Sequence, residues 1–282
     1  MRKSKTIYEI LRNNDNQNAL DWLTEKTDKL ENSRSARDLF MTYSLLASKF
    51  DKAQAVNYGA DENDTVLYFK SHRADLLQIS RIYLLTKVLE MNPEFYTPEV
   101  AKIIQVADTT ELETFLRYLT MLPQSENFKY SAVEALRTNI SIVFDAITLN
   151  NPYPALYFND QQWNQMYLKA VFMERDLGMI QSVDERANAD LTRIISDYAH
   201  ERWAASRTID PMFWRPVSKF MDDTLLADMK RLLSSEDPIE NKAGALCCYF
   251  SENDSALALL EQHNELKEQI TLNNITWNTL KN

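Results

Sequence analysis

A chain of 282 residues, with 45% hydrophobic and 26% charged residues, has the composition of a globular protein with a sizeable core. It contains 3 glycines, far below the usual share of about 7%. Sheets with tight hairpins and glycine-rich phosphate loops are therefore disfavoured, and an all-α fold is predicted. The net charge of −10 argues against nucleic acid and against an anionic membrane surface as partners.

The first fifty residues predict helices joined by short polar turns. One helix is expected over 4–12, and the next carries apolar residues at helical spacing from Leu20 to Leu30. Ser35 is placed to begin a third helix, because a short oxygen-bearing side chain accepts a hydrogen bond from an unpaired first-turn amide.

Residues 51–70 are the least helical part of the chain. Alternating oxygen-bearing side chains from Asp61 to Thr65 suggest a calcium loop. However, Val66 stands where that loop needs glycine, and His72 stands where it needs glutamate. A solvated loop is the better interpretation, and such a loop could cover a binding surface.

Helix starts can be read between residues 72 and 158. Asn92-Pro93 and Thr97-Pro98 are each expected to begin a helix, because proline is tolerated where the amide has no partner. Asp108 with Glu111 has the spacing of a capping box. Segment 150–158 is not expected to be regular helix, because its prolines restrict the residues before them. Further helices are expected over 72–90, 127–137 and 139–149.

Two strong helices are predicted between residues 159 and 217. The first is expected to end near Gly178, and the second is expected to be capped by Asn188 and to run to about Ser206. On the second helix Arg202 falls inside the apolar arc, where an unpaired guanidinium costs several kcal/mol. We therefore expect one of two arrangements. Either Arg202 pairs with Glu174 or Asp184 and pins the two helices together, or it extends to water.

Three segments of this stretch carry a family resemblance. They are WNQMYLKAVF (163–172), DERANADLTRIISDYAHERWAASR (184–207) and PMFWRPV (211–217). They resemble the signature of the EboA family of bacterial metabolite-traffic proteins, in which a DERAN-type turn enters a helix that ends in a DYAHERWAA-type run. We call residues 159–217 the signature segment.

The resemblance implies a process and not a reaction. The family is associated with gene clusters implicated in moving secondary-metabolite precursors towards the periplasm. A member is therefore expected to be a non-enzymatic protein that binds a metabolite, or proteins of the same pathway, and helps to deliver the metabolite for export.

Beyond the signature segment the helix signals continue, with Asp210-Pro211 and Asp237-Pro238 as starts. Helices are expected near 211–221, 222–234, 240–250, 254–263 and 265–280. The start signals suit stacked antiparallel helix pairs in a HEAT-like α-solenoid, and an irregular helical bundle is the rival architecture. We expect residues 1–282 to form a single all-helical domain.

Motifs of known enzymes do not explain the chain. His200-Glu201 does not extend to HExxH, and the sequence has no GxSxG, P-loop or GxGxxG, so no catalytic residue, metal or cofactor is assigned. The alternative is an enzyme that modifies the metabolite through His200 with Asp197 or Glu201, since a carboxylate beside an imidazole can tune proton transfer. A solvated helix face is the simpler interpretation of these residues.

The signature segment also supplies a candidate ligand or partner surface. Aromatic walls with a few polar anchors suit flat apolar metabolites. Aromatic residues at helical spacing are also typical of a core, so both interpretations stand. The candidate residues are Trp163, Asn164, Lys169, Arg193, Asp197, His200 and Trp203.

The cellular setting follows from the cysteines and from the hydropathy. Cys247 and Cys248 are adjacent on an expected helix, where neighbouring side chains point about 100° apart, so a disulfide between them is disfavoured. A reducing compartment fits, and no stretch has the length of a signal peptide or a membrane span. The expected location is the cytoplasm.

Overall fold

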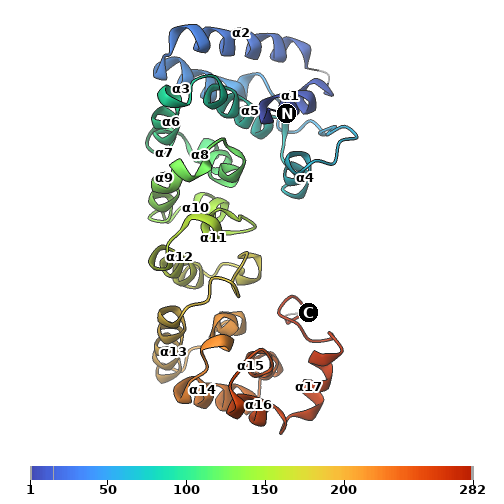
Figure 1. Ribbon diagram of the computed structural model, residues 1–282, viewed down its shortest axis with the longest axis vertical. Coiled ribbons are helices and arrows are strands. Elements are labelled where there is room, and N and C mark those ends of the chain that lie inside the picture. Colours follow the sequence, from blue (N-terminus) through green and yellow to red (C-terminus); the bar gives the residue numbers. More distant parts are fainter. Residues whose placement is uncertain (1, 15, 281–282) are drawn as a thin grey trace. The chain divides into compact units, whose positions relative to one another are not determined.

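In the computed structural model, which describes residues 2–14 and 16–280, helices are the regular structure (Figure 1). These described residues form α-helices α1 to α17 and 3-10 helices η1 to η5, with no strand among them. The all-α prediction is therefore confirmed. Contacts divide the chain into two compact units, Met1–Ile147 and Thr148–Asn282. In the described part of the chain no helix is both long enough and apolar enough to cross a bilayer.

Unit 1 is built around one buried helix, α5, which packs against α1, α2, α6 and α8. Residues on all sides of α5 are buried, including the charged residue Arg81. The helices of this unit are α1 (Lys3–Arg12), α2 (Gln17–Ser33), α3 (Ala36–Leu45), η1 (Leu46–Ser48), α4 (Asp64–Ser71), α5 (Leu76–Met91), α6 (Pro93–Ala101), α7 (Ile103–Val106), α8 (Thr109–Arg117), η2 (Leu119–Met121), η3 (Ser125–Phe128), α9 (Lys129–Ala135) and α10 (Ser141–Thr148).

The helix starts in unit 1 follow local capping. Ser35 caps α3, and Asp108 with Glu111 makes the predicted capping box at α8. The expected start at Thr97-Pro98 is wrong, because Asn92 already caps α6 and Pro98 lies inside that helix. The long helix begins at Leu76, a few residues later than expected, because Asp75 forms a capping box that fixes its first turn.

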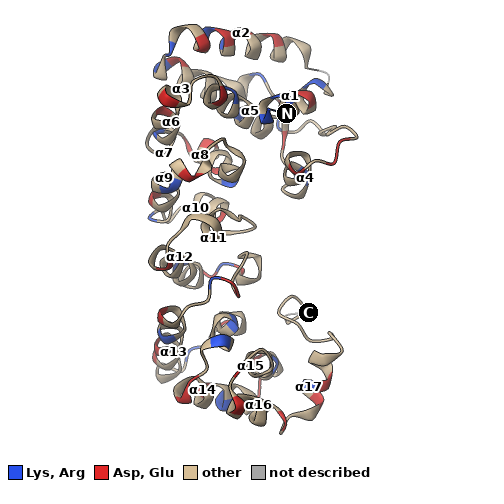
Figure 2. Ribbon diagram, viewed as in Figure 1, with Lys and Arg blue, Asp and Glu red and all other residues tan. Residues whose placement is uncertain are grey.

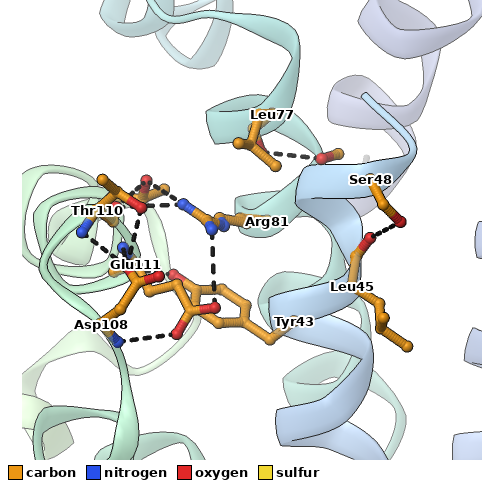
Figure 3. Close-up of polar contacts among 10 residues, drawn as sticks. Tyr43, Leu45, Ser48, Leu77, Arg81, Asp108, Thr110 and Glu111 are labelled. Atoms are coloured by element: carbon orange, nitrogen blue, oxygen red, sulfur yellow. Dashed lines mark hydrogen bonds and ion pairs between the residues drawn. The ribbon is translucent and has the colours of Figure 1, made fainter. Parts of the chain in front are cut away.

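Buried polar groups join α3, α5 and α8 (Figure 3). Arg81 is 2% exposed, and its Nη1 donates to the Thr110 carbonyl at 3.2 Å. Its Nη2 lies 3.7 Å from Glu111 Oε1, and its guanidinium stacks over the Tyr43 ring. The Tyr43 hydroxyl donates to the Glu111 carbonyl at 2.9 Å. This cluster places a charge pair in the core, where the loss of either partner leaves the other charge uncompensated.

Unit 2 is built around α15 (Pro238–Tyr249), which packs against η5, α14, α16 and α17. Its cysteines Cys247 and Cys248 are both free and buried, as expected for neighbours on a helix. The other helices of this unit are α11 (Tyr153–Tyr157), α12 (Asp160–Phe172), η4 (Leu177–Met179), α13 (Ala189–Ala204), η5 (Pro211–Phe220), α14 (Asp223–Leu233), α16 (Asp254–Leu260) and α17 (Asn264–Thr271).

Several details of unit 2 differ from the sequence analysis. The helix expected near 211–221 is the 3-10 helix η5, and the helix expected over 265–280 ends at Thr271. Segment 150–158 contains the short helix α11, because Pro154 lies in its first turn, where its missing amide donor costs nothing. The helix before Gly178 ends earlier, at Phe172, and Gly178 lies in η4. Asn159 and Gln162 form a capping box at the start of α12, and Asn188 caps α13 as predicted.

Candidate functional site

The signature segment lies in unit 2, and its two main helices are joined by a reciprocal amide pair. Asn164 Nδ2 on α12 donates to Asn188 Oδ1 at 3.1 Å, and Asn188 Nδ2 donates back to Asn164 Oδ1 at 2.9 Å. Asn188 Oδ1 also accepts from the Leu191 amide as the cap of α13. One side chain therefore begins a helix and fixes it to the preceding one.

The aspartate of the DERAN turn is paired with an arginine from η5. Arg215 Nε and Nη2 donate to the two carboxylate oxygens of Asp184 at 2.9 and 2.6 Å. Lys219 Nζ donates to the Asp184 carbonyl at 3.3 Å. Burial lowers the pKa of the Arg215 guanidinium, but the hydrogen bonds and charge of Asp184 outweigh this and raise its pKa above the ordinary value.

The arginine of the same turn, Arg186, closes the end of α11. Its Nη1 donates to the carbonyls of Pro154 and Ala155 at 3.1 and 2.8 Å, and its Nη2 donates to the Phe158 carbonyl at 2.9 Å. Its guanidinium also lies 5.0 Å from the centroid of the Trp163 ring, which is 1% exposed. Arg186 therefore supplies donors to carbonyls at the end of a helix, where the Pro154 carbonyl also accepts from the Phe158 amide.

Of the two arrangements expected for Arg202, the ion pair with Glu174 or Asp184 is not found among the described residues. The Arg202 guanidinium donates through Nε and Nη2 to the Thr208 carbonyl at 3.1 and 2.7 Å, and Asp184 is paired with Arg215. The reason is local, since α13 ends at Ala204 and the chain turns back, which brings a carbonyl within reach of Arg202. Glu174 adopts a left-handed conformation (φ 54°) in the turn after α12, where it joins Arg202 in the wall of a cavity.

His200 has a carboxylate partner that differs from the expected ones. Its Nε2 lies 2.6 Å from Asp228 Oδ1 on α14, and Asp228 is 4% exposed. Ser196 Oγ donates to the other Asp228 oxygen at 2.6 Å. Asp197 instead pairs with Arg193 in an exposed contact one helical turn away. The pairing of His200 with Asp197 or Glu201 is therefore replaced by a contact between α13 and α14.

The remaining candidate residues separate into buried and exposed groups. Trp163 and Asn164 are buried, so they serve the core of unit 2. Burial lowers the pKa of Lys169, which lies partly covered on α12. Trp203 is partly buried, and its ring stacks on Trp214 with centroids 5.5 Å apart. Trp163 and Asn164 are therefore separated from the exposed candidates, whereas His200 and Trp203 on α13 remain in contact, with ring centroids 5.7 Å apart.

Two distant parts of the signature segment instead meet at one cavity of about 340 Å³. The DERAN turn and η5 form one side of it, and residues nearer the C-terminus form the other. We call it the signature cavity. Its lining residues are Asp184, Ala187, Arg215, Pro216, Ser218, Lys219, Phe250, Thr276, Trp277 and Asn278.

The signature cavity combines apolar walls with a polar end. Pro216, Phe250 and Trp277 present apolar and aromatic surface, and Phe250 is 52% exposed. Lys219 is exposed, and the Arg215–Asp184 pair lies beside it. A mostly apolar cavity with a few charged groups is the usual form of a small-molecule site. Lys and Arg are interspersed with Asp and Glu along this unit (Figure 2), so the cationic end is a local feature of an acidic chain.

A second cavity, of about 560 Å³, lies at the C-terminal ends of α12 and α13. Phe172, Glu174, Tyr198 and Arg202 are among its lining residues, and Phe172 is 80% exposed. We call it the helix-end cavity. Its lining is about equally polar and apolar, so it offers less continuous apolar surface to a ligand than the signature cavity.

Several residues of the candidate site were missed by sequence reasoning. Arg186 and Arg215 stand inside the motifs that carry the resemblance, but their partners depend on how the loops fold. Asp228 and Trp277 lie outside those motifs, and no local spacing connects them to His200 or to the DERAN turn.

Comparison with known families identifies a matching family. Residues 3–218 match the family model described as metabolite traffic protein EboA, which covers more than half of the chain. No curated protein and no solved structure is found to match. The matched range ends within η5, so Phe250 and Trp277 lie outside it.

Proposed function

Because the chain belongs to the EboA family of metabolite traffic proteins, we propose that it is a non-enzymatic carrier that binds a small metabolite in the signature cavity. The observation that carries this proposal is the convergence of the DERAN turn and η5 on that cavity. These two parts of the signature segment are far apart in sequence. Each contributes a charged group to the same opening, namely Asp184 and Arg215.

The lining defines the class of ligand. A volume of about 340 Å³ suits a compact molecule. The aromatic walls formed by Phe250 and Trp277 favour a flat apolar body. Lys219 hydrogen-bonds the Asp184 carbonyl at 3.3 Å, which leaves further ammonium donors for an anionic group. We propose that the ligand is a flat, mostly aromatic compound with one anionic substituent.

Binding of 2-naphthoate and of uncharged 2-naphthalenemethanol to the full chain tests this proposal by calorimetry. Lys219→Gln should weaken naphthoate binding about tenfold, as for the loss of about 1.4 kcal/mol, and should leave the alcohol unaffected. Trp277→Ala should weaken both ligands, because it removes the shared aromatic wall. Tyr198→Ala in the helix-end cavity is the matched control and should change neither affinity.

Other results would reject this site. Loss of binding in Tyr198→Ala with normal binding in Trp277→Ala would indicate that the ligand binds in the helix-end cavity. Equal weakening of the acid and the alcohol by Lys219→Gln would contradict the proposal that the ligand carries an anionic substituent. Failure of the wild-type chain to bind either compound would count against carriage of aromatic metabolites.

The structure gives one observation that favours the enzyme alternative. The hydrogen bond to Asp228 holds His200 in a fixed position while 48% of its side chain is exposed, as a general base requires. However, Ser196 donates to Asp228 and not to His200, so this serine is not activated as a nucleophile. Turnover of a bound compound that is lost in His200→Ala would support catalysis, and unchanged ligand recovered after incubation would support carriage.

Delivery to partner proteins of the same pathway completes the proposal. A carrier must pass its ligand on, so a pull-down from cells that make the metabolite should recover another protein of the pathway. We expect the recovered amount to depend on ligand. Recovery that is the same in wild type and Trp277→Ala would indicate a scaffold that does not need the signature cavity.

A further inference from the structure

Unit 2 contains another cavity, of about 490 Å³, whose lining differs from that of the signature cavity. It lies where α13 and α14 end and α15 begins, and we call it the arginine cavity. It combines one aromatic wall, two arginines and several hydroxyl side chains. Its lining residues are Trp203, Ser206, Arg207, Thr208, Arg231, Ser234, Ser235 and Glu240.

The turn after α13 fixes one side of this cavity. Ser206 adopts a left-handed conformation (φ 53°), and the Arg207 amide donates to the Arg202 carbonyl at 2.9 Å, which reverses the chain. The Arg202 side chain donates to the Thr208 carbonyl and holds the next residue in place. Arg207 and Thr208 therefore stand on a backbone that is fixed by hydrogen bonds on both sides.

A stack of flat groups fixes the other side. The Arg231 guanidinium carbon lies 4.2 Å from the centroid of the Trp203 ring. Trp203 in turn stacks on Trp214, which is fully buried. Stacking on the face of a ring leaves the N–H groups at the edge of the guanidinium free to bind an anion. Arg231 is therefore positioned before any ligand arrives.

In the part of the chain that the structure describes, neither arginine of this cavity is occupied by an ion pair with a carboxylate. Among residues 2–14 and 16–280, neither Arg207 nor Arg231 has a carboxylate within 4.0 Å in an ion pair, although the chain carries a net charge of −10. Glu240 lines the cavity without forming such a pair. Each arginine also follows or ends a helix, where a cation is favoured by the helix dipole. The helix dipole accounts for a cation at each helix end, but it does not account for two arginines in one cavity.

We propose that the arginine cavity binds the phosphate group of a small molecule. A planar carboxylate is saturated by one guanidinium fork, whereas a tetrahedral phosphate offers three oxygens to several donors at once. Arg207 and Arg231 come from different elements, and Ser206, Thr208 and Ser234 add hydroxyl donors around them. This site does not depend on the signature cavity, and its ligand need not be the transported metabolite.

Calorimetric titration of the full chain with inorganic phosphate, phenyl phosphate and acetate tests the proposal. Arg231→Gln and Arg207→Gln should each weaken phosphate binding about tenfold, as loss of a charged hydrogen-bonding group does. Arg193→Gln removes the same charge from the exposed face of α13 and is the matched control, with no expected change. Acetate should bind more weakly than phosphate.

Glu240→Gln gives a test that cannot be confused with misfolding. Removal of the carboxylate that lines the cavity should strengthen phosphate binding about threefold or more, because a like charge beside the anion is lost. The proposal is overturned if neither wild type nor Glu240→Gln binds phosphate at millimolar concentration. It is also overturned if Arg193→Gln weakens binding as much as Arg231→Gln, or if acetate binds as well as phosphate. Naphthoate binding should be unchanged in Arg231→Gln, which separates this site from the signature cavity.

Discussion

Replacement of Arg186 by glutamine tests whether the DERAN turn holds unit 2 together. The change removes hydrogen bonds to the carbonyls of Pro154, Ala155 and Phe158 and the contact with the face of Trp163. The Arg186 side chain is 15% exposed, so water can reach these carbonyls only in part. The free energy of unfolding should therefore fall by more than a surface substitution would cause.

The size of the effect follows from these contacts. A hydrogen bond to a charged donor contributes about 1.5 to 3 kcal/mol, and a cation–π contact contributes about 0.5 to 1 kcal/mol. Contacts of one side chain are not additive, and glutamine retains one donor group, so we expect a loss of about 3 kcal/mol. With a urea dependence of about 2 kcal/mol per molar, this lowers the unfolding midpoint by about 1.5 M.

Tryptophan fluorescence during urea unfolding measures this change. Trp163, Trp203, Trp214 and Trp277 belong to unit 2, so most of the signal reports that unit. Arg193→Gln is the control, because an exposed pair one helical turn apart contributes only about 0.3 to 0.5 kcal/mol. A midpoint for Arg186→Gln close to that of Arg193→Gln would refute the structural role of the DERAN arginine.

Other substitutions test the buried charges, the tight packing and the thiols. Glu111→Gln keeps an acceptor for the α8 capping box but leaves the buried Arg81 without a carboxylate, so thermal unfolding followed by circular dichroism should show a loss of about 3 kcal/mol. Gly244→Ala should lower the free energy of unfolding by about 1 to 3 kcal/mol, because its Cβ would lie 3.0 Å from a leucine of α14. The urea midpoint should fall accordingly, and a higher midpoint would show that α14 shifts freely. Burial raises the pKa of the Cys248 thiol to about 12 from 9.0, and it raises that of Cys247 as well. A thiol-reactive reagent at pH 8 should therefore label these cysteines only after unfolding, and the stability contributed by neutral Cys248 should fall as pH rises from 9.0 to about 12.

Features that depend on neighbouring residues were predictable from the sequence. Ser35, Asn188 and the pair Asp108 and Glu111 begin helices where expected, because a cap needs only its own first turn. Glycine scarcity and helical periodicity were likewise sufficient for the all-α fold class.

Features that depend on distant residues were not predictable. Arg202 was expected either to pair with a carboxylate or to extend to water, but the turn after α13 offers the carbonyl of Thr208. For His200 the sequence suggested a solvated helix face or, as the alternative, a carboxylate of its own helix, but Asp228 approaches it from α14. In both cases the nearest partner is set by where the chain turns, which the spacing of residues on one helix does not determine.

The signature cavity was missed for the same reason, since its walls come from three separate regions. Asp184 and Arg215 are recognisable in the motifs, but their pairing became visible only in the fold. Trp277 lies beyond the family match and carries no local signal. Helical spacing suggested Trp163 as a ligand residue, and the structure places its ring in the core.

The division of roles within the signature segment bears on how the ligand is selected. Arg186 and Asn188 form hydrogen bonds that hold the DERAN turn in the fold, and Asp184 of the same turn lines the cavity while it is paired with Arg215. The aromatic surface comes instead from Phe250 and Trp277, outside the matched range. In the proposed carrier, framework and recognition are therefore encoded in different parts of the chain, and we expect the C-terminal residues that line the signature cavity to select the metabolite.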